Sequence, residues 1–229
     1  MSHLHLPDGV LPVWLWIAGL LAAAAINGAA MWVLRGGDLR RTVPRIGVFA
    51  GLMLVGMNLE IVPIAYHVNL AALAGIVLPP AHAVVAVTLA NLMLATMGHG
   101  GVTVTGVNAA LLSIEAVAAG LLFRFWRRFV LPGKAAAVST LGSLILSTGA
   151  ALGVIAAGGI DVGRVGEWGG LLGGRPGEAG FRLRDFAAVF LPLAAVGWII
   201  EMVVSASLVR FLVQVRPHLI EEPPRKAGP

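Results

Sequence analysis

Long apolar stretches separated by short polar loops dominate this chain. Stretches of about 20 mainly apolar residues are typical of helices that cross a membrane, whose hydrocarbon core is about 30 Å thick. A shorter apolar segment, residues 64–80, ends in two prolines. The pattern therefore predicts an all-α, polytopic transmembrane bundle that forms one domain over residues 1–229, with clear spans at residues 11–34, 46–63, 81–98, 105–123, 135–157 and 185–213.

The composition supports a multi-pass protein of the cell membrane, in contact with lipid. Hydrophobic residues make up 58% of the chain, the mean hydropathy is +0.90, and 12% of the residues are charged. Soluble domains carry about 25% charged residues. The net charge of +5 comes mainly from a few basic loops. We therefore interpret it as a sign of how the chain is oriented in the membrane, and we expect no nucleic-acid partner.

Basic residues are concentrated in three places. Twelve of the sixteen Lys and Arg lie in residues 35–45, in residues 124–134 and from Arg210 onward. The positive-inside rule places all three in the cytoplasm. The chain between the first two must then cross an even number of times, so segment 64–80 must also cross the membrane or re-enter fully across its core. This count predicts about seven crossings, with the N-terminus and the Gly-rich loop 158–184 outside, and the C-terminus with tail 214–229 inside.

The first nine residues carry two of the six histidines, His3 and His5. A terminal amine, peptide nitrogens and the imidazole of His3 have the spacing of a planar nitrogen chelate, a geometry diagnostic of Ni(II) or Cu(II). The chain has no cysteine, so thiolate ligands are excluded. The segment lacks the basic start and small-residue cleavage site of a signal peptide, and we expect it to be retained. The alternative is an unstructured start with two chance histidines.

Two further histidines are predicted on the outer side. His67 lies at the outer start of segment 64–80, and Asn69 follows two residues later; a metal-site role is favoured over a capping role. His99 precedes two glycines, a sequence that suits a tight turn, so turn and site are equally favoured there. His82 and His218 are expected to lie on the cytoplasmic side and not to be ligands.

Polar residues inside the spans suggest further contacts. Intramembrane carboxylates are functional candidates by default, and the candidates are Glu60, Glu115 and Glu201. Glu115 and Glu201 lie deep in their spans, which suits coupling or helix pairing better than an outer site. Small residues in 135–157 favour close helix packing, and we expect Ser143 and Ser147 to face a partner subunit.

The chain has no phosphate-binding loop, whose Gly, four residues, Gly-Lys and Ser/Thr pattern is not matched around Gly133-Lys134. We therefore expect a non-enzymatic component that relies on a partner or an ion gradient for energy.

Three parts of the sequence resemble the CbiM/NikM family, the cobalt and nickel substrate-specific components of energy-coupling-factor transporters. They are His5-Leu-Pro-Asp-Gly-Val-Leu-Pro12, the histidine at position 67, and His99-Gly-Gly-Val-Thr-Val-Thr-Gly-Val-Asn108. The resemblance covers most of residues 3–125 well and the rest by span pattern only.

The resemblance implies that Co²⁺ or Ni²⁺ is the substrate, with no permanent cofactor. In the family, the metal is held by the terminal amine, by the backbone nitrogen and imidazole of the histidine after the initiator, and by a helix histidine. The Pro-Asp-Gly register assigns the second-residue role to His5, but the chain begins four residues before it, so His3 or His5 is the chelating imidazole. The expected metal ligands are Met1, Ser2, His3, His5 and His67, supported by Asn69, His99 and Asn108.

The resemblance also implies partners: a transmembrane coupling subunit, ATPase subunits and a small membrane subunit. Two other functions fit the residues. One is a stand-alone, gradient-driven metal permease, and the other is a structural membrane subunit without a substrate.

Overall fold

The computed structural model describes residues 6, 8, 9, 11–58, 67–159 and 183–220. The described residues form seven α-helices and one 3-10 helix, and contain no strand. The all-helical prediction is therefore confirmed for this part of the chain. Met1, Ser2, His3, His5, Glu60 and most of the Gly-rich loop lie outside the described residues.

Helix boundaries follow proline and capping signals. Pro80 and Pro132 each occupy the first turn of a helix, where a missing N–H costs nothing. The helices are α1 Val13–Leu34, α2 Leu39–Asn58, α3 Ala71–Val77, α4 Pro80–Thr96, α5 Thr105–Trp126, α6 Pro132–Ala157, α8 Leu183–Val215 and the 3-10 helix η2 Pro217–Leu219.

α2 begins seven residues before the predicted span. Asp38 lies just before it, and its carboxylate accepts a hydrogen bond from the Arg40 backbone N–H at 3.0 Å. A side-chain oxygen in this position satisfies a free N–H of the first turn. Residues 39–45 of the basic segment 35–45, which was predicted as a loop, therefore form the first turns of α2.

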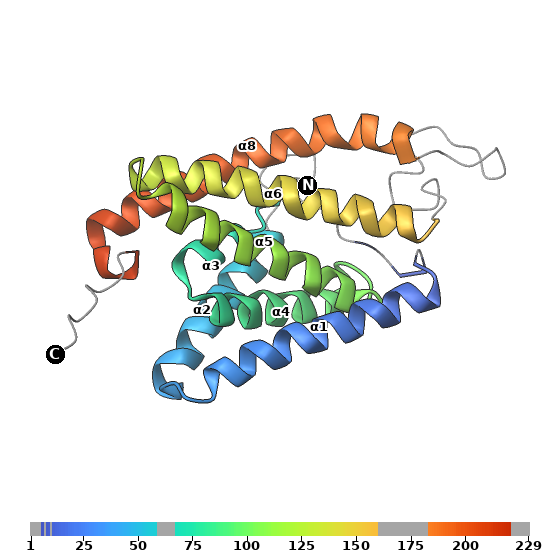
Figure 1. Cartoon of the computed structure of the whole chain (residues 1–229), viewed down its shortest axis with the longest axis horizontal. Helices are drawn as coiled ribbons and strands as arrows, with labels where there is room; N and C mark the ends of the chain where they lie inside the picture. Colours follow the sequence, from blue (N-terminus) through green and yellow to red (C-terminus); the bar gives the residue numbers. More distant parts are fainter. Residues whose placement is uncertain (1–5, 7, 10, 59–66, 160–182, 221–229) are drawn as a thin grey trace.

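α5 is the central helix, with contacts to α1, α3, α4 and α6 (Figure 1). α8 packs on α6, and α2 packs on α4. α3 and α5 approach at Gly75, where an added Cβ would collide with the backbone oxygen of Ala116. Small residues thus set the helix spacing around α5.

Large apolar side chains cover the outside of the bundle. Trp32 is 73% exposed and Leu21 67% exposed, both on α1. Four helices of the described chain are long and apolar enough to cross a membrane: α1, α5, α6 and residues Phe186–Val215 of α8; α4 is apolar but shorter. An apolar exterior on long apolar helices is the arrangement of a multi-pass membrane protein.

The described part of segment 64–80, which was predicted to cross the membrane or to re-enter it, is not one continuous helix. Residues 67–70 lack regular structure, and α3 has seven residues, which gives it a length of about 10 Å. Leu70 starts α3 with a left-handed φ of 60°, and Pro79-Pro80 follow its end, so the helix cannot extend in either direction. Ala71–Ile76 are all buried.

The serines of α6 face the chain itself. Ser143 is fully buried, and the Ser147 hydroxyl donates to a Glu115 carboxylate oxygen at 3.0 Å. The expectation that these two serines face a partner subunit is therefore wrong, because their small size serves packing against α5.

The arginine-bearing loops come together at one end of the bundle. Arg45 near the start of α2, Arg124 and Arg127 at the end of α5, and η2 line a common cavity. His99 follows the other end of α4, about 25 Å away along a helix of 17 residues. The bundle thus has a basic end and, opposite to it, an end with His99.

Candidate metal-binding site

The N-terminal segment is docked onto the start of α5 through Leu6. The Asn108 side chain accepts a hydrogen bond from the Leu6 N–H and donates one to the Leu6 carbonyl, both at 3.1 Å. The Leu6 carbonyl also accepts a hydrogen bond from the Gly101 N–H at 3.2 Å. Leu6 has no exposed surface and belongs to an apolar cluster with Val107 and Phe190. The segment is therefore held by backbone pairing and by burial of Leu6.

Asp8 forms the second anchor of this segment. One of its carboxylate oxygens accepts a hydrogen bond from the Val102 N–H at 2.9 Å, and the other accepts from the Thr103 N–H at 2.8 Å and from the Thr103 hydroxyl. The Thr103 hydroxyl is the main cause that lowers the pKa of Asp8 below its ordinary value of 3.8. A Cβ at Gly101 would collide with Asp8. The His99-Gly-Gly-Val-Thr motif is thus a cradle for the N-terminal segment.

His67 and His99 lie next to each other at this end of the bundle. Their ring centroids are 5.9 Å apart, with the rings nearly perpendicular. His99 follows α4 in a turn in which Gly98 and Gly100 both have φ of +83°, and its N–H donates to the Leu94 carbonyl. His99 is therefore in a tight turn, and the same turn brings its imidazole beside His67.

A buried polar cluster lies two residues after His67. The Asn69 N–H donates to a Glu201 carboxylate oxygen, and the Asn69 side-chain amide donates to Glu115, both at 2.7 Å. Asn69, Glu115 and Glu201 are each at most 1% exposed. Glu201 therefore holds the backbone just after His67, and Glu115 holds the Asn69 side chain. Of the two roles expected for Glu115, coupling or helix pairing, its bond from Ser147 shows the pairing of α5 with α6.

The other two histidines of the described chain lie at the basic end. His82 Nε2 is 3.3 Å from the Thr42 hydroxyl, and His218 lines the cavity formed with Arg45 and Arg127. Within the described residues, no three His, Asp or Glu side chains form a group that could hold a metal ion. The structure brings together His67 and His99, and places Asn108 and Asn69 next to the segments that carry them. It does not describe Met1, Ser2, His3 or His5.

Sequence reasoning missed two parts of this arrangement. The glycines of Pro-Asp-Gly and of Gly100-Gly101 indicated that the backbone could approach closely at both places. They did not indicate the contact itself, because no spacing rule connects Asp8 with residues 94 or 95 positions away. The bonds from Asn69 to Glu115 and Glu201 span 46 and 132 residues. Intramembrane carboxylates indicated function, but not their common partner.

The fold and the docked segment together define a polytopic helical membrane protein with a histidine-bearing end built around its N-terminus. Residues 5–219 match the CbiM family, described as the cobalt uptake substrate-specific transmembrane region. The chain belongs to this family and is a transmembrane component of transition-metal uptake.

Two crystal structures have the same fold. A transition metal transporter superposes with a TM-score of 0.73 at 19% identity, covering 93% of this chain and 93% of that one. A truncated transition metal transporter also gives a TM-score of 0.73, at 18% identity, covering 92% of this chain and 99% of that one. A comparison with curated protein sequences finds no match.

Proposed function

We propose that this chain is the substrate-binding membrane component of an energy-coupling-factor importer for Co²⁺ or Ni²⁺. The observation that carries the proposal is the docking of Leu6 and Asp8 onto the loop that bears His99, which itself contacts His67. His5 precedes Leu6 directly and His3 precedes it by three residues. On this proposal, the short connection to the anchored Leu6 brings the terminal histidines to the same end of the bundle as His67.

The proposed ligands are nitrogens of Met1, Ser2, His3 and His5 with the imidazole of His67. Nitrogen donors suit Ni(II) and Co(II), and a planar nitrogen set favours Ni(II), whereas the family description is of cobalt uptake. Both ions thus remain in the proposal. His99 and Asn108 support the site, His99 by contact with the His67 ring and Asn108 by holding Leu6.

Asn69 gives His67 a fixed position. Its backbone N–H and its side chain are bound by carboxylates from two helices, α8 and α5. Changing a residue that orients a metal ligand typically lowers metal affinity about 10- to 100-fold. Asn69 therefore acts on the metal through the backbone of the His67 segment.

The proposed membrane topology is based on the basic end of the bundle. We place that end in the cytoplasm by the positive-inside rule, with seven crossings of the cell membrane and the histidine end outside. This orientation presents the N-terminal segment, loop 158–184 and the metal to the exterior and tail 214–229 to the cytoplasm. Partner ATPases, a coupling subunit and a small membrane subunit then drive import.

Titration of the purified full chain with Ni²⁺ and Co²⁺ tests the proposal. His67→Ala removes the ligand that connects the terminal segment to the bundle, and we expect it to abolish tight binding. His218→Ala is the matched control, because it removes an imidazole at the opposite end. Equal affinity of the two variants would contradict the proposed site.

Vesicle uptake separates the importer from a gradient-driven permease. The proposal expects metal uptake only when the ATPase and coupling subunits are present with ATP. Uptake by this chain alone, driven by an imposed ion gradient, would favour the permease.

A further inference from the structure

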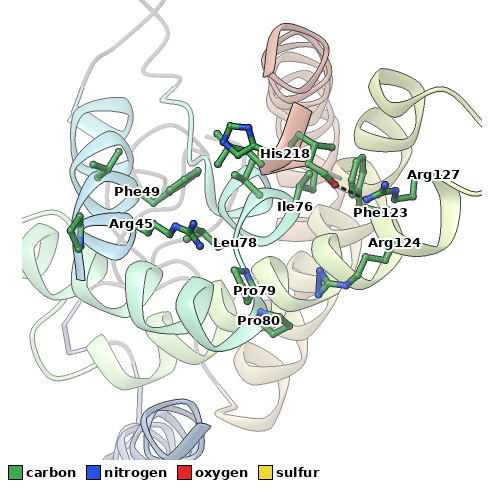
Figure 2. Close-up of a pocket in the computed structure, with 15 residues that line it drawn as sticks. Arg45, Phe49, Ile76, Leu78, Pro79, Pro80, Phe123, Arg124, Arg127 and His218 are labelled. Atoms are coloured by element: carbon green, nitrogen blue, oxygen red, sulfur yellow. Dashed lines mark hydrogen bonds between the residues drawn. The ribbon is translucent and has the colours of Figure 1, made fainter. Parts of the chain in front are cut away.

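A cavity of about 620 Å³ opens at the basic end of the bundle, far from the histidine end. Its walls come from α2, the α3–α4 junction, the end of α5 and η2 (Figure 2). The metal site proposed above uses none of these residues. The cavity therefore needs a separate explanation.

Arginine side chains line this cavity on two sides. Figure 2 shows Arg45 on one side and Arg124 and Arg127 on the other, with His218 nearby on η2. No carboxylate is among the described residues that line the cavity. The ion pair found in the described part of the chain joins Arg41 to Asp38 and leaves these three arginines out. The cavity is thus a cation cluster without an acidic counterpart in the described chain.

Arg127 is held in place with donors to spare. One of its terminal nitrogens donates to the Ile220 carbonyl at 2.6 Å, and its guanidinium carbon lies 5.9 Å from the Phe123 ring centroid. A guanidinium has five N–H donors, so this bond leaves most of them available. A preorganised guanidinium loses little freedom when it binds an anion.

The floor of the cavity is apolar. Phe49, Ile76 and Phe123 line it together with Pro79 and Pro80. A small hydrated anion gains nothing from such a surface, whereas the glycerol and upper acyl carbons of a lipid do. Basic pockets between transmembrane helices are recognised binding places for anionic lipid head groups.

We propose that this cavity binds a phosphate group, supplied by the head group of an anionic phospholipid. Arg45 and Arg124 contact the phosphate from opposite sides, Arg127 contributes its remaining donors, and the apolar floor receives the lipid carbons. Planar guanidinium groups match phosphate oxygens in pairs, which makes arginine the residue for such recognition. Free phosphate shares the same chemistry and is the alternative source of the group.

Native mass spectrometry of the purified full chain with added phosphatidylglycerol or phosphatidylcholine tests this proposal. Wild type is expected to prefer phosphatidylglycerol. The double variant Arg45→Gln, Arg124→Gln is expected to bind it about 25-fold more weakly, at about fivefold for each arginine near the surface. The control Arg128→Gln, Lys134→Gln removes the same charge from exposed positions outside the cavity and is expected to bind like wild type.

Equal loss in the two double variants would overturn the proposal, since the effect would then be net charge alone. Competition by inorganic phosphate distinguishes the lipid head group from free phosphate. If inorganic phosphate displaces phosphatidylglycerol only at far higher concentrations, the lipid is supported as the source of the phosphate group. If the two bind with equal affinity, the lipid is overturned as the source. The acidic residues after Ile220 are the remaining rival occupants. The double variant Glu221→Gln, Glu222→Gln is expected to bind phosphatidylglycerol more strongly than wild type. This gain should disappear when Arg45 and Arg124 are also replaced by Gln, and a gain that persists without the two arginines would count against the cavity. Ni²⁺ titration of each variant verifies its fold independently.

Discussion

Asn108→Leu is expected to release the N-terminal segment and thereby weaken metal binding. The substitution keeps the number and branching of the side-chain heavy atoms but removes both hydrogen bonds to Leu6. The Leu6 carbonyl keeps its bond from Gly101, whereas the Leu6 N–H loses the partner it has in the structure. Because Leu6 is fully buried, the change leaves a buried donor unsatisfied.

An unsatisfied buried donor costs about 1–3 kcal/mol. At about 1.4 kcal/mol per tenfold change, the docking equilibrium of the segment falls about 5- to 150-fold. If the terminal histidines serve the site only in the docked state, as proposed, the apparent metal affinity falls by at most the same factor. Competition with a chromogenic chelator measures the affinity, and hydrogen exchange of peptides that contain Leu6 measures docking.

Asn27→Leu is the matched control. It also removes two hydrogen bonds, to the Ala23 carbonyl at 2.9 Å and the Thr88 hydroxyl at 3.0 Å, but they lie within α1 and between α1 and α4. We expect wild-type affinity and slow exchange at Leu6 in this control. Wild-type metal affinity in Asn108→Leu, with fast exchange at Leu6, would refute the reasoning that docking supplies the ligands.

Because hydrogen bonding lowers the folded-state pKa of Asp8 below 3.8, its anchoring is complete above that value and is lost only as the pH falls through the lowered pKa. Asp8→Asn should therefore weaken Ni²⁺ binding at pH 7, measured by titration. Gly75→Ala should destabilise the bundle by about 1–3 kcal/mol, because the added Cβ collides with the Ala116 backbone. Thermal unfolding in detergent measures the loss, and the control Gly153→Ala, whose added Cβ meets open space, should show none. A reporter at the C-terminus should read cytoplasmic and one inserted within 160–180 external, and the same side for both would contradict the seven-crossing topology.

The sequence predicted the long helices well. The apolar runs at 105–123 and 135–157 became α5 and α6 with ends shifted by up to three residues, because continuous apolar runs and flanking basic residues or proline define such helices. The short helix inside segment 64–80 was not predicted, because burial inside the bundle, rather than contact with lipid, explains the apolar residues of α3. Apolar composition does not distinguish these two environments.

The candidate site could be predicted in part. The even number of crossings expected between the first two basic loops predicted that His67 and His99 lie on the same side of the membrane. The contact between their rings confirms that the two residues lie together. The bonds of Asn69 and the inward orientation of Ser147 were not predictable, because they depend on how α5, α6 and α8 rotate against one another. The roles of His3 and His5 stay predictions, since both lie outside the described residues.

X-ray absorption at the Ni K-edge of the full chain, loaded at saturating Ni²⁺, tests whether the N-terminal segment and His67 hold the metal. We expect a shell of nitrogen ligands without sulfur in wild type. We expect weaker imidazole scattering in His67→Ala and in the double variant His3→Ala, His5→Ala, both of which bind Ni²⁺ less tightly. Binding should also decrease as the pH falls through the histidine range, since the ligands must be deprotonated. An oxygen-only shell, or identical spectra in wild type and both variants, would contradict the claim that the N-terminal segment and His67 hold the metal.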